Sequence, residues 1–453
     1  MKNKIESFLE PYKPHYLPNL KLALPVVLSQ AGQMVVNLVD TLMVGQLGST
    51  ELAAVSFANS IFIVGFVLII GLSIAVTPLV GKTHGSGNSH KTGFWLKQGI
   101  VGVGMFAVAQ TILMLLVSLL MPFMGQEPEV VAMAIPFYLV IVSSIFPISI
   151  FFVFKQFAEG ISNTRIAMVI TLAANAINII LNYILIYGKL GAPEMGVMGA
   201  GWATFISRIL MPLIFIIVFA YLPFFKSYKK VYLSTKVEMK KVWELIKIGF
   251  PIGGQMVIEV FAFSMGAIMM GWISKEAMAA HQVVIAIASV TYMMSSGLAS
   301  AATIKVSTYR GAGDWFNVKA SAYAIVHKVI VFMTFTAIAF ILARNVLPRI
   351  FSDEFEVLLV ASQLMVVAGI FQVFDGLQIA WLGILRGLED VKAPTIITFV
   401  TWILMALPIS YICAFQFNMG PSGIWVGYLS GLAIASIWLR YRFKGLYKKL
   451  IYN

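Results

Sequence analysis

The chain has 453 residues, of which 60% are hydrophobic and only 11% are charged, and its formal net charge is +13. About a quarter of the residues of a soluble domain are charged, so this composition excludes an ordinary soluble protein, and its hydrophobicity excludes a disordered chain. The 32 basic residues are separated by long uncharged runs, which excludes the continuous basic face that nucleic acids require. We therefore expect an integral membrane protein that contacts membrane lipids and binds no nucleic acid.

The apolar stretches predict an all-α fold with twelve transmembrane helices, since a helix needs about 20 mainly apolar residues to cross the bilayer. Turn residues or charges separate the stretches. In chain order they are 20–46, 52–79, 94–123, 130–154, 164–187, 197–221, 243–273, 278–304, 320–343, 356–385, 394–416 and 421–440. The longest polar connection follows the sixth of them. We expect two six-helix lobes, residues 1–222 and 243–453, joined by a cytoplasmic linker at 223–242.

The basic residues predict the orientation, because Lys and Arg accumulate in short cytoplasmic loops. If the N-terminus is inside, 27 of the 32 basic residues fall on the cytoplasmic side and four on the opposite side. The remaining one, Arg208, lies within a span and is the only cation expected there. This distribution predicts a multi-pass protein whose N- and C-termini are both cytoplasmic.

The two halves of the chain repeat each other at a constant offset of half the chain length. The aligned pairs include Pro25 with Pro251, Met43 with Met269, Gly45 with Gly271, Gly85 with Gly311, and Gly87 with Gly313. Each half contains six spans, an even number, so the halves have the same orientation and form a parallel repeat. Two such lobes favour a transporter that works by alternating access over a passive channel.

Three acidic residues lie well inside predicted spans: Asp40, Glu259 and Asp375. A carboxylate in the middle of a membrane costs about 2.5–3.5 kcal/mol and normally serves function. Polar residues at helical spacing accompany them on the first and fifth spans. These are Gln30, Gln33 and Asn37 before Asp40, and Thr171, Asn175, Asn178 and Asn182 on the fifth span. The amide stripes could also hold helices together, but neutral Asn would do so at lower cost than the three acids.

A buried carboxylate has two uses that the sequence leaves open. It can take up a proton on one side of the membrane and release it on the other, or it can hold Na⁺ together with carbonyl and amide oxygens. We expect Arg208 to bind backbone carbonyls rather than an acid. We expect His281 to be packed or hydrogen-bonded rather than to relay protons.

Several segments resemble the multidrug and toxic compound extrusion (MATE) family of transporters. They are Val39-Asp40-Thr41-Leu42-Met43-Val44-Gly45, Ala280-His281-Gln282-Val283, Asn178-Ile179-Ile180-Leu181-Asn182-Tyr183, and Phe374-Asp375-Gly376-Leu377-Gln378. The resemblance covers essentially the whole chain and is closest to the NorM-like branch. It implies twelve helices in two lobes and export of drugs driven by Na⁺ or H⁺.

The resemblance also implies two cation sites. Asp40, Asn178 and Asn182 fall on the site of the first lobe, with Thr204 as a neighbour, and Glu259 and Asp375 fall on the site of the second lobe. The candidate transport residues are Asp40, Glu259, Asp375, Asn178, Asn182, Thr204, Gln33, Asn37 and Asn175. Phe371 stands where sodium-coupled members tend to have Tyr, which weakens the case for Na⁺ at Glu259 and Asp375. Asn182 stands where the DinF-type branch has an acid.

The sequence therefore predicts an antiporter of a bacterial inner membrane that exports lipophilic organic cations, acts as a monomer and needs no cofactor. The alternative is a flippase for a lipid-linked saccharide, which would need basic residues to hold a pyrophosphate. The chain has no His-Glu-x-x-His motif, no Gly-x-Ser-x-Gly motif and no phosphate-binding loop. We therefore do not expect an enzyme.

Overall fold

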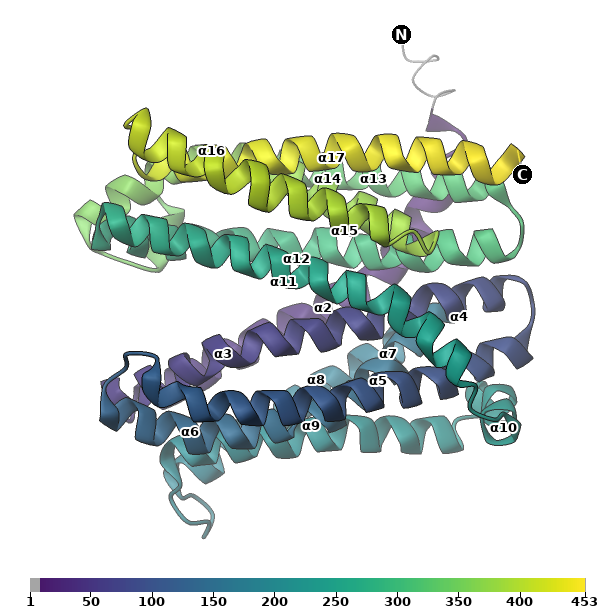
Figure 1. The fold of residues 1–453 in the computed structure, drawn as a ribbon, viewed down its shortest axis with the longest axis horizontal. Coiled ribbons are helices and arrows are strands. Elements are labelled where there is room, and N and C mark those ends of the chain that lie inside the picture. Colours follow the sequence, from purple (N-terminus) through teal and green to yellow (C-terminus); the bar gives the residue numbers. More distant parts are fainter. Residues whose placement is uncertain (1–8, 453) are drawn as a thin grey trace. The chain divides into compact units, whose positions relative to one another are not determined.

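The computed structural model describes residues 9–452, which are helical almost throughout and include no strand within that range. Figure 1 traces the helices in chain order. They are α2 (Lys13–Gly45), α3 (Ser49–Ile74), α4 (Val76–Gly85), α5 (Ser89–Val117), α6 (Pro128–Ser143), α7 (Ile145–Gly160), α8 (Thr164–Tyr187), α9 (Gly196–Tyr221), α10 (Lys226–Ser234), α11 (Met239–Ile273), α12 (Lys275–Gly311), α13 (Trp315–Leu342), α14 (Phe355–Gly387), α15 (Lys392–Phe399), α16 (Leu407–Tyr411) and α17 (Pro421–Tyr452). Lys2 and Lys4, two of the basic residues behind the predicted orientation, lie outside the described residues.

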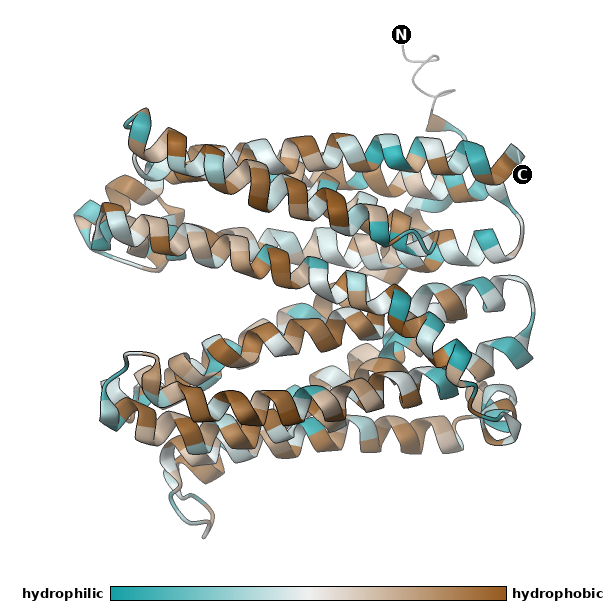
Figure 2. Cartoon of the chain, viewed as in Figure 1, coloured by the Kyte–Doolittle hydropathy of each residue, from teal (hydrophilic) through white to brown (hydrophobic). Residues whose placement is uncertain are grey.

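Within residues 9–452, twelve helical segments are long and apolar enough to cross a bilayer, which confirms the predicted number of spans. Helices α3 and α4 together form one of these segments, and α6 and α7 form another. A further span, Lys392–Gln416, combines α15 and α16 with two stretches of π-helix. Figure 2 shows hydrophobic residues along most of α9 and hydrophilic residues gathered at α10.

Several helices continue beyond the apolar stretches that the sequence marks. The second span was predicted to end at residue 79 and the fourth at 154, whereas the helices end at Gly85 and Gly160. Hydropathy records where apolar residues stop, but a helix continues until a turn or a capping residue interrupts it. Asn88 and Asp314 begin α5 and α13 by accepting hydrogen bonds from backbone N–H groups three residues on. Charged residues beyond the apolar stretches can therefore lie inside packed helices.

The internal repeat is visible in equivalent contacts of the two halves. The hydroxyl of Thr77 donates a hydrogen bond to the backbone carbonyl of Gln156 at 3.0 Å. In the second half, the hydroxyl of Thr303 donates to the backbone carbonyl of Gly383 at 2.9 Å. Thr303 occupies the position that aligns with Thr77 in the repeat, so the same helix contact is built twice.

The chain packs as two compact units whose boundaries differ from those of the predicted lobes. Unit 1 contains the chain up to Val27 and from Gly254 onward, and unit 2 contains Leu28–Gly253. The boundaries fall inside α2 and α11, so each of these helices begins in one unit and ends in the other. Leu22 accordingly lies in a hydrophobic core of unit 1, and Leu245 lies in one of unit 2. The two boundaries fall at aligned positions of the internal repeat.

The predicted linker at 223–242 is not a simple polar connection, because it contains helix α10 and the first turn of α11. Lys97 on α5 fastens the end of α10 by donating to the backbone carbonyls of Tyr232 at 3.2 Å and Thr235 at 2.6 Å. Gln98 donates to the carbonyl of Lys236 at 3.0 Å. Hydropathy missed α10 because the helix is short and carries three lysines.

Candidate functional site

In unit 2 the structure brings together Asp40 on α2 and two asparagines on α8. The carboxamide of Asn182 donates to one carboxylate oxygen of Asp40 and also to Oδ1 of Asn178, the latter at 3.3 Å. Asn178 and Asn182 are one helical turn apart, so the hydrogen bond between them follows from their spacing. Asn182 is fully buried, and its own Oδ1 has no hydrogen-bond partner. The result is a half-buried carboxylate beside a buried amide oxygen that has no hydrogen-bond donor.

Arg208 on α9 provides the positive charge of this site. Its guanidinium donates to the hydroxyl of Ser144 at 2.8 Å and lies over the rings of Phe62 and Phe66, 4.9 and 5.1 Å from their centroids. It is also close enough to Asp40 for the opposite charges to attract each other. The predicted contact with backbone carbonyls is not seen among the described residues, since the guanidinium bonds to a side-chain hydroxyl, and it forms no ion pair with Asp40 within 4.0 Å. The aromatic rings of Phe62 and Phe66 and the hydroxyl of Ser144 fix the guanidinium at a position from which its charge attracts the carboxylate of Asp40.

The other polar residues predicted for this site have different surroundings. Gln33 and Asn37 are exposed and form a long hydrogen bond of 3.4 Å with each other. Asn175 is buried, and its Nδ2 has no partner. Thr204 on α9 is half-buried and makes no hydrogen bond within residues 9–452. The hydrogen-bonded cluster thus comprises Asp40, Asn178 and Asn182, and the remaining four stay predictions from spacing and resemblance.

In unit 1 the corresponding carboxylate is that of Glu259 on α11. Its Oε1 accepts hydrogen bonds from the carboxamides of Gln255 at 3.3 Å and Gln378 at 3.0 Å. Gln378, which comes from α14, is buried, and its own Oε1 has no partner. Unit 1 therefore also holds a carboxylate bound by carboxamides, with glutamines in place of asparagines, but Glu259 is not at the position of the repeat that aligns with Asp40.

Arg386 is a charged residue near Glu259 that the predicted set of candidate residues does not include. It lies in the last turn of α14, its side chain is buried, and its Nη2 donates to Oε1 of Gln255 at 3.2 Å. Its charge acts on Glu259, so Arg208 is not the only cation within the spans. The predicted span ends at residue 385, so Arg386 was counted among the cytoplasmic basic residues. The neighbouring Gly387, which aligns with Gly160 in the repeat, could have indicated that the helix continues.

Asp375 lies near Glu259, and the two like charges repel each other. Asp375 is half-buried and makes no hydrogen bond among the described residues. Tyr292 on α12 lies near both acids and near Arg386, and it was also missed by the sequence analysis. Glu259 is thus fixed by amides, whereas Asp375 is held by packing alone.

No group of three or more His, Cys, Asp or Glu side chains in residues 9–452 could hold a metal ion. Any Na⁺ at Glu259 and Asp375 would therefore depend on amide, hydroxyl or water oxygens for its other ligands. Phe371, one turn before Asp375, is buried against the rings of Phe263 and Trp425 and supplies no oxygen.

His281 is completely buried on α12 and accepts a hydrogen bond from the indole of Trp425 at 3.1 Å. The structure confirms the expected packed and hydrogen-bonded histidine.

The two halves of the repeat carry different residues at equivalent positions of the candidate site. The position of unit 1 that aligns with Asp40 is Gly266, and a Cβ there would collide with the hydroxyl of Tyr428. That hydroxyl donates to the backbone carbonyl of Ala262 at 3.3 Å. A tyrosine therefore fills the space in unit 1 that the Asp40 carboxylate occupies in unit 2.

Comparisons with known proteins place these features in a family. The MatE family model matches residues 25–184 and again residues 251–412, so the two matches begin at the aligned prolines Pro25 and Pro251 and confirm the internal repeat. The chain is 31% identical to the probable multidrug resistance protein NorM of Rhizobium meliloti (strain 1021), over 96% of this chain and 94% of the relative. It is 31% identical to the multidrug resistance protein MdtK of Edwardsiella ictaluri (strain 93-146), over 95% of each.

Solved structures share the fold at lower sequence identity. A mutant of the Vibrio cholerae MATE transporter VcmN superposes with a TM-score of 0.88 and is 17% identical, over 97% of this chain and 98% of that one. The eukaryotic MATE transporter AtDTX14 superposes with a TM-score of 0.86 and is 20% identical, over 96% of both chains. These comparisons confirm the predicted all-α membrane fold.

Proposed function

Because the chain belongs to the MatE family of membrane transporters, we propose that it is a multidrug efflux antiporter of the bacterial inner membrane. It exports lipophilic organic cations in exchange for an inward-moving cation. Its relatives are named as multidrug resistance proteins. The proposed exchange makes and breaks no covalent bond, so it needs no enzymatic residues and no cofactor. Each candidate site is built from one chain, so a monomer suffices.

One observation carries this proposal: each unit holds a carboxylate beside an amide oxygen that accepts no hydrogen bond. In unit 2 these are Asp40 and Oδ1 of Asn182, and in unit 1 they are Glu259 and Oε1 of Gln378. A buried acceptor without a donor costs about 1–3 kcal/mol. A cation or a protonated water beside the carboxylate would satisfy that oxygen and neutralise the charge. The chain is therefore equipped to bind a small cation in each half.

Charge neutralisation couples the two transported species. An ionised carboxylate attracts an organic cation, and occupation of the same carboxylate by the inward-moving cation removes that attraction. Alternating access of the two lobes then separates the two binding events onto opposite sides of the membrane. The organic cation leaves where the coupling cation enters.

We propose that the coupling cation is H⁺ rather than Na⁺. Arg208 acts on Asp40 and Arg386 acts on Glu259. A fixed guanidinium next to a carboxylate repels a metal ion, whereas a proton binds to the carboxylate oxygen itself and loses less from that repulsion. The apolar side chain of Phe371 supports the same choice.

The test is transport of a fluorescent cationic dye into or out of proteoliposomes under an imposed gradient of H⁺ or of Na⁺. We expect dye movement with the H⁺ gradient alone, and none with empty liposomes. The variant Asp40→Asn should insert normally and lose transport. The control Glu127→Gln removes an exposed carboxylate before α6 and should transport normally. Movement driven only by Na⁺ would contradict proton coupling, and wild-type export by Asp40→Asn would remove Asp40 from the site.

The proposed orientation, with cytoplasmic termini, has its own test. Cys413 is the only cysteine of the chain, so Cys413→Ser gives a background free of thiols. Single cysteines introduced at Asn88 and at Gly191 should then report opposite sides of the membrane. A membrane-impermeant thiol reagent added to whole cells should label the second and not the first. The reverse pattern would invert the topology.

Neither arginine favours the flippase alternative. A pyrophosphate needs several basic groups that face one another, yet each unit has a single arginine beside its candidate acid, Arg208 at Asp40 and Arg386 at Glu259. Three acids in the same surroundings would repel the phosphates.

A further inference from the structure

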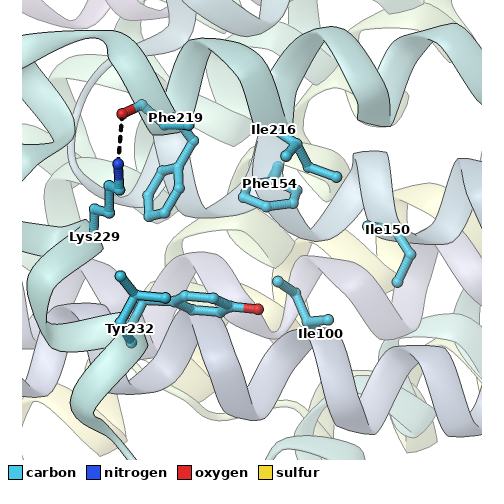
Figure 3. A pocket seen from close by; sticks show the side chains of 9 residues that line it. Ile100, Ile150, Phe154, Ile216, Phe219, Lys229 and Tyr232 are labelled. Carbon is cyan, nitrogen blue, oxygen red and sulfur yellow. Dashed lines mark hydrogen bonds between the residues drawn. The ribbon is translucent and has the colours of Figure 1, made fainter.

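A cavity of about 290 Å³ lies within unit 2, between the long helices and α10. Its walls come from α5, α7, α9 and α10 and are almost entirely apolar, as Figure 3 shows. The apolar lining includes Ile100, Ile150, Phe154, Ile216 and Phe219. None of the candidate transport residues lines it, so it is separate from the Asp40 site.

The cavity opens beside the exposed apolar surface of α9. Ile216 lines the cavity and is 44% exposed, and its neighbours Leu213 and Ile217 are 48% and 58% exposed. Exposed apolar side chains on a membrane-spanning helix contact lipid chains. A lipid chain next to α9 can therefore enter the cavity without crossing a polar surface.

One end of the cavity is polar. Lys229 lies there and donates to the backbone carbonyl of Ala220, in the last turn of α9, at 2.9 Å. Figure 3 also shows the hydroxyl of Tyr232 directed toward Ile100. Burial raises the pKa of Tyr232, so its hydroxyl stays neutral and able to donate a hydrogen bond. Lys226 and Lys230, on the same short helix, are exposed.

We propose that this cavity binds an anionic phospholipid, with one acyl chain between the helices and the phosphate beside the lysines of α10. An acyl chain matches the apolar walls, and three lysines within five residues complement a negative headgroup. A lipophilic cation would fit the walls equally well, but Lys229 and its neighbours would repel it. The bound lipid would hold α10 against the ends of α5 and α9, and would thereby stiffen the connection into α11.

The experiment is native mass spectrometry of the purified full-length protein, titrated with phosphatidylglycerol or with phosphatidylcholine of the same chain lengths. We expect the wild type to retain phosphatidylglycerol preferentially. Changing Lys226, Lys229 and Lys230 to Gln should weaken phosphatidylglycerol binding about fivefold per lysine and leave phosphatidylcholine binding unchanged. Ile150→Trp should fill the cavity and reduce retention of both lipids.

Two matched controls separate this site from general lipid contact. Lys240→Gln removes an exposed charge at the start of α11, and Ile217→Trp adds the same bulk on α9 outside the cavity. Both should retain phosphatidylglycerol as the wild type does.

If Ile150→Trp fails to fold, as judged by its thermal unfolding, Ala220→Leu serves as the variant that fills the cavity. Equal retention of the two lipids by the wild type would overturn the proposal, as would equal retention by the filling and control variants. Displacement of the lipid by a cationic dye would instead show a drug site.

Discussion

The carboxamide of Asn182 donates a hydrogen bond to the carboxylate of Asp40 and so joins two helices whose residues lie 142 positions apart in the sequence. This contact fixes the position of the Asp40 carboxylate, which lies within a membrane-spanning helix and near Arg208. The asparagine orients the carboxylate, and Arg208 balances its charge. The geometry of the proposed cation site therefore depends on Asn182 as much as on the acid.

Removal of the donor should impair export without abolishing it. A hydrogen bond to a charged group is worth about 1.5–3 kcal/mol, so Asn182→Ala should reduce dye export about tenfold or more. Asn178→Ala should have a smaller effect, because Asn178 contacts Asp40 only through Asn182. The measurement is the initial rate of dye export at matched expression.

A double-mutant cycle provides the control for this prediction. If Asn182 acts through Asp40, the double variant Asp40→Asn, Asn182→Ala should transport no worse than Asp40→Asn alone. If the two substitutions instead lower the unfolding temperature additively, and Asn182→Ala alone leaves cation-driven transport unchanged, then Asn182 only holds the helices together.

The acids of unit 1 provide a second prediction. The combined variant Glu259→Gln, Asp375→Asn retains side chains of similar size but removes the charge of Glu259, on which Arg386 acts, and that of Asp375, which repels Glu259. We expect it to lose transport driven by the cation gradient while still binding the dye. The measurements are dye binding in detergent and gradient-driven transport in proteoliposomes. Intact coupling in this variant would restrict the ion site to Asp40 and its neighbours.

The sequence predicted the fold well because its signals are local. Apolar length predicts the spans, and paired residues at a fixed offset predict the repeat. The hydrogen bond between Asn178 and Asn182 follows from a spacing of four residues on one helix. Each of these inferences requires only the geometry of a single helix.

Contacts between helices could not be read in the same way. Gln378 lies three residues after Asp375 on the same helix, yet its carboxamide donates to Glu259 on another helix. Arg386 was left outside the predicted span because hydropathy ends a span at its last apolar residue, whereas a buried arginine can continue a helix if a partner such as Gln255 accepts its hydrogen bond. The asymmetry between Asp40 and Gly266 depends on Tyr428, which approaches from α17.

Arg386 should stabilise unit 1 through its charge, which gives a third prediction. Arg386→Gln leaves Glu259 without its neighbouring cation, and we expect a loss of about 1–3 kcal/mol of stability. Arg386→Lys should restore part of it, because lysine keeps the charge but not the planar group of donors. The measurement is the thermal unfolding of purified protein in detergent.

The matched variant for Arg386 removes both charges. Glu259→Gln combined with Arg386→Gln should be more stable than Arg386→Gln alone, because no uncompensated charge remains buried. A double variant that is less stable than either single variant would show that Arg386 acts through packing rather than through charge.

The internal repeat gives a fourth prediction, because it places two glycines at equivalent close contacts. A Cβ on Gly160 would lie 2.6 Å from a methyl carbon of Val80, and one on Gly387 would lie 2.8 Å from the Cβ of Val306. Neither distance leaves room for a methyl group, and both valines are completely buried and cannot move aside. Gly160→Ala and Gly387→Ala should therefore each cost about 1–3 kcal/mol of stability, as overpacking usually does.

Gly445→Ala is the control, since a Cβ on Gly445 has no heavy atom within 4 Å and alanine favours the helix. Thermal unfolding of the three variants measures the difference, and equal unfolding temperatures for all three would show that the equivalent helix contacts of the two halves are not tightly packed.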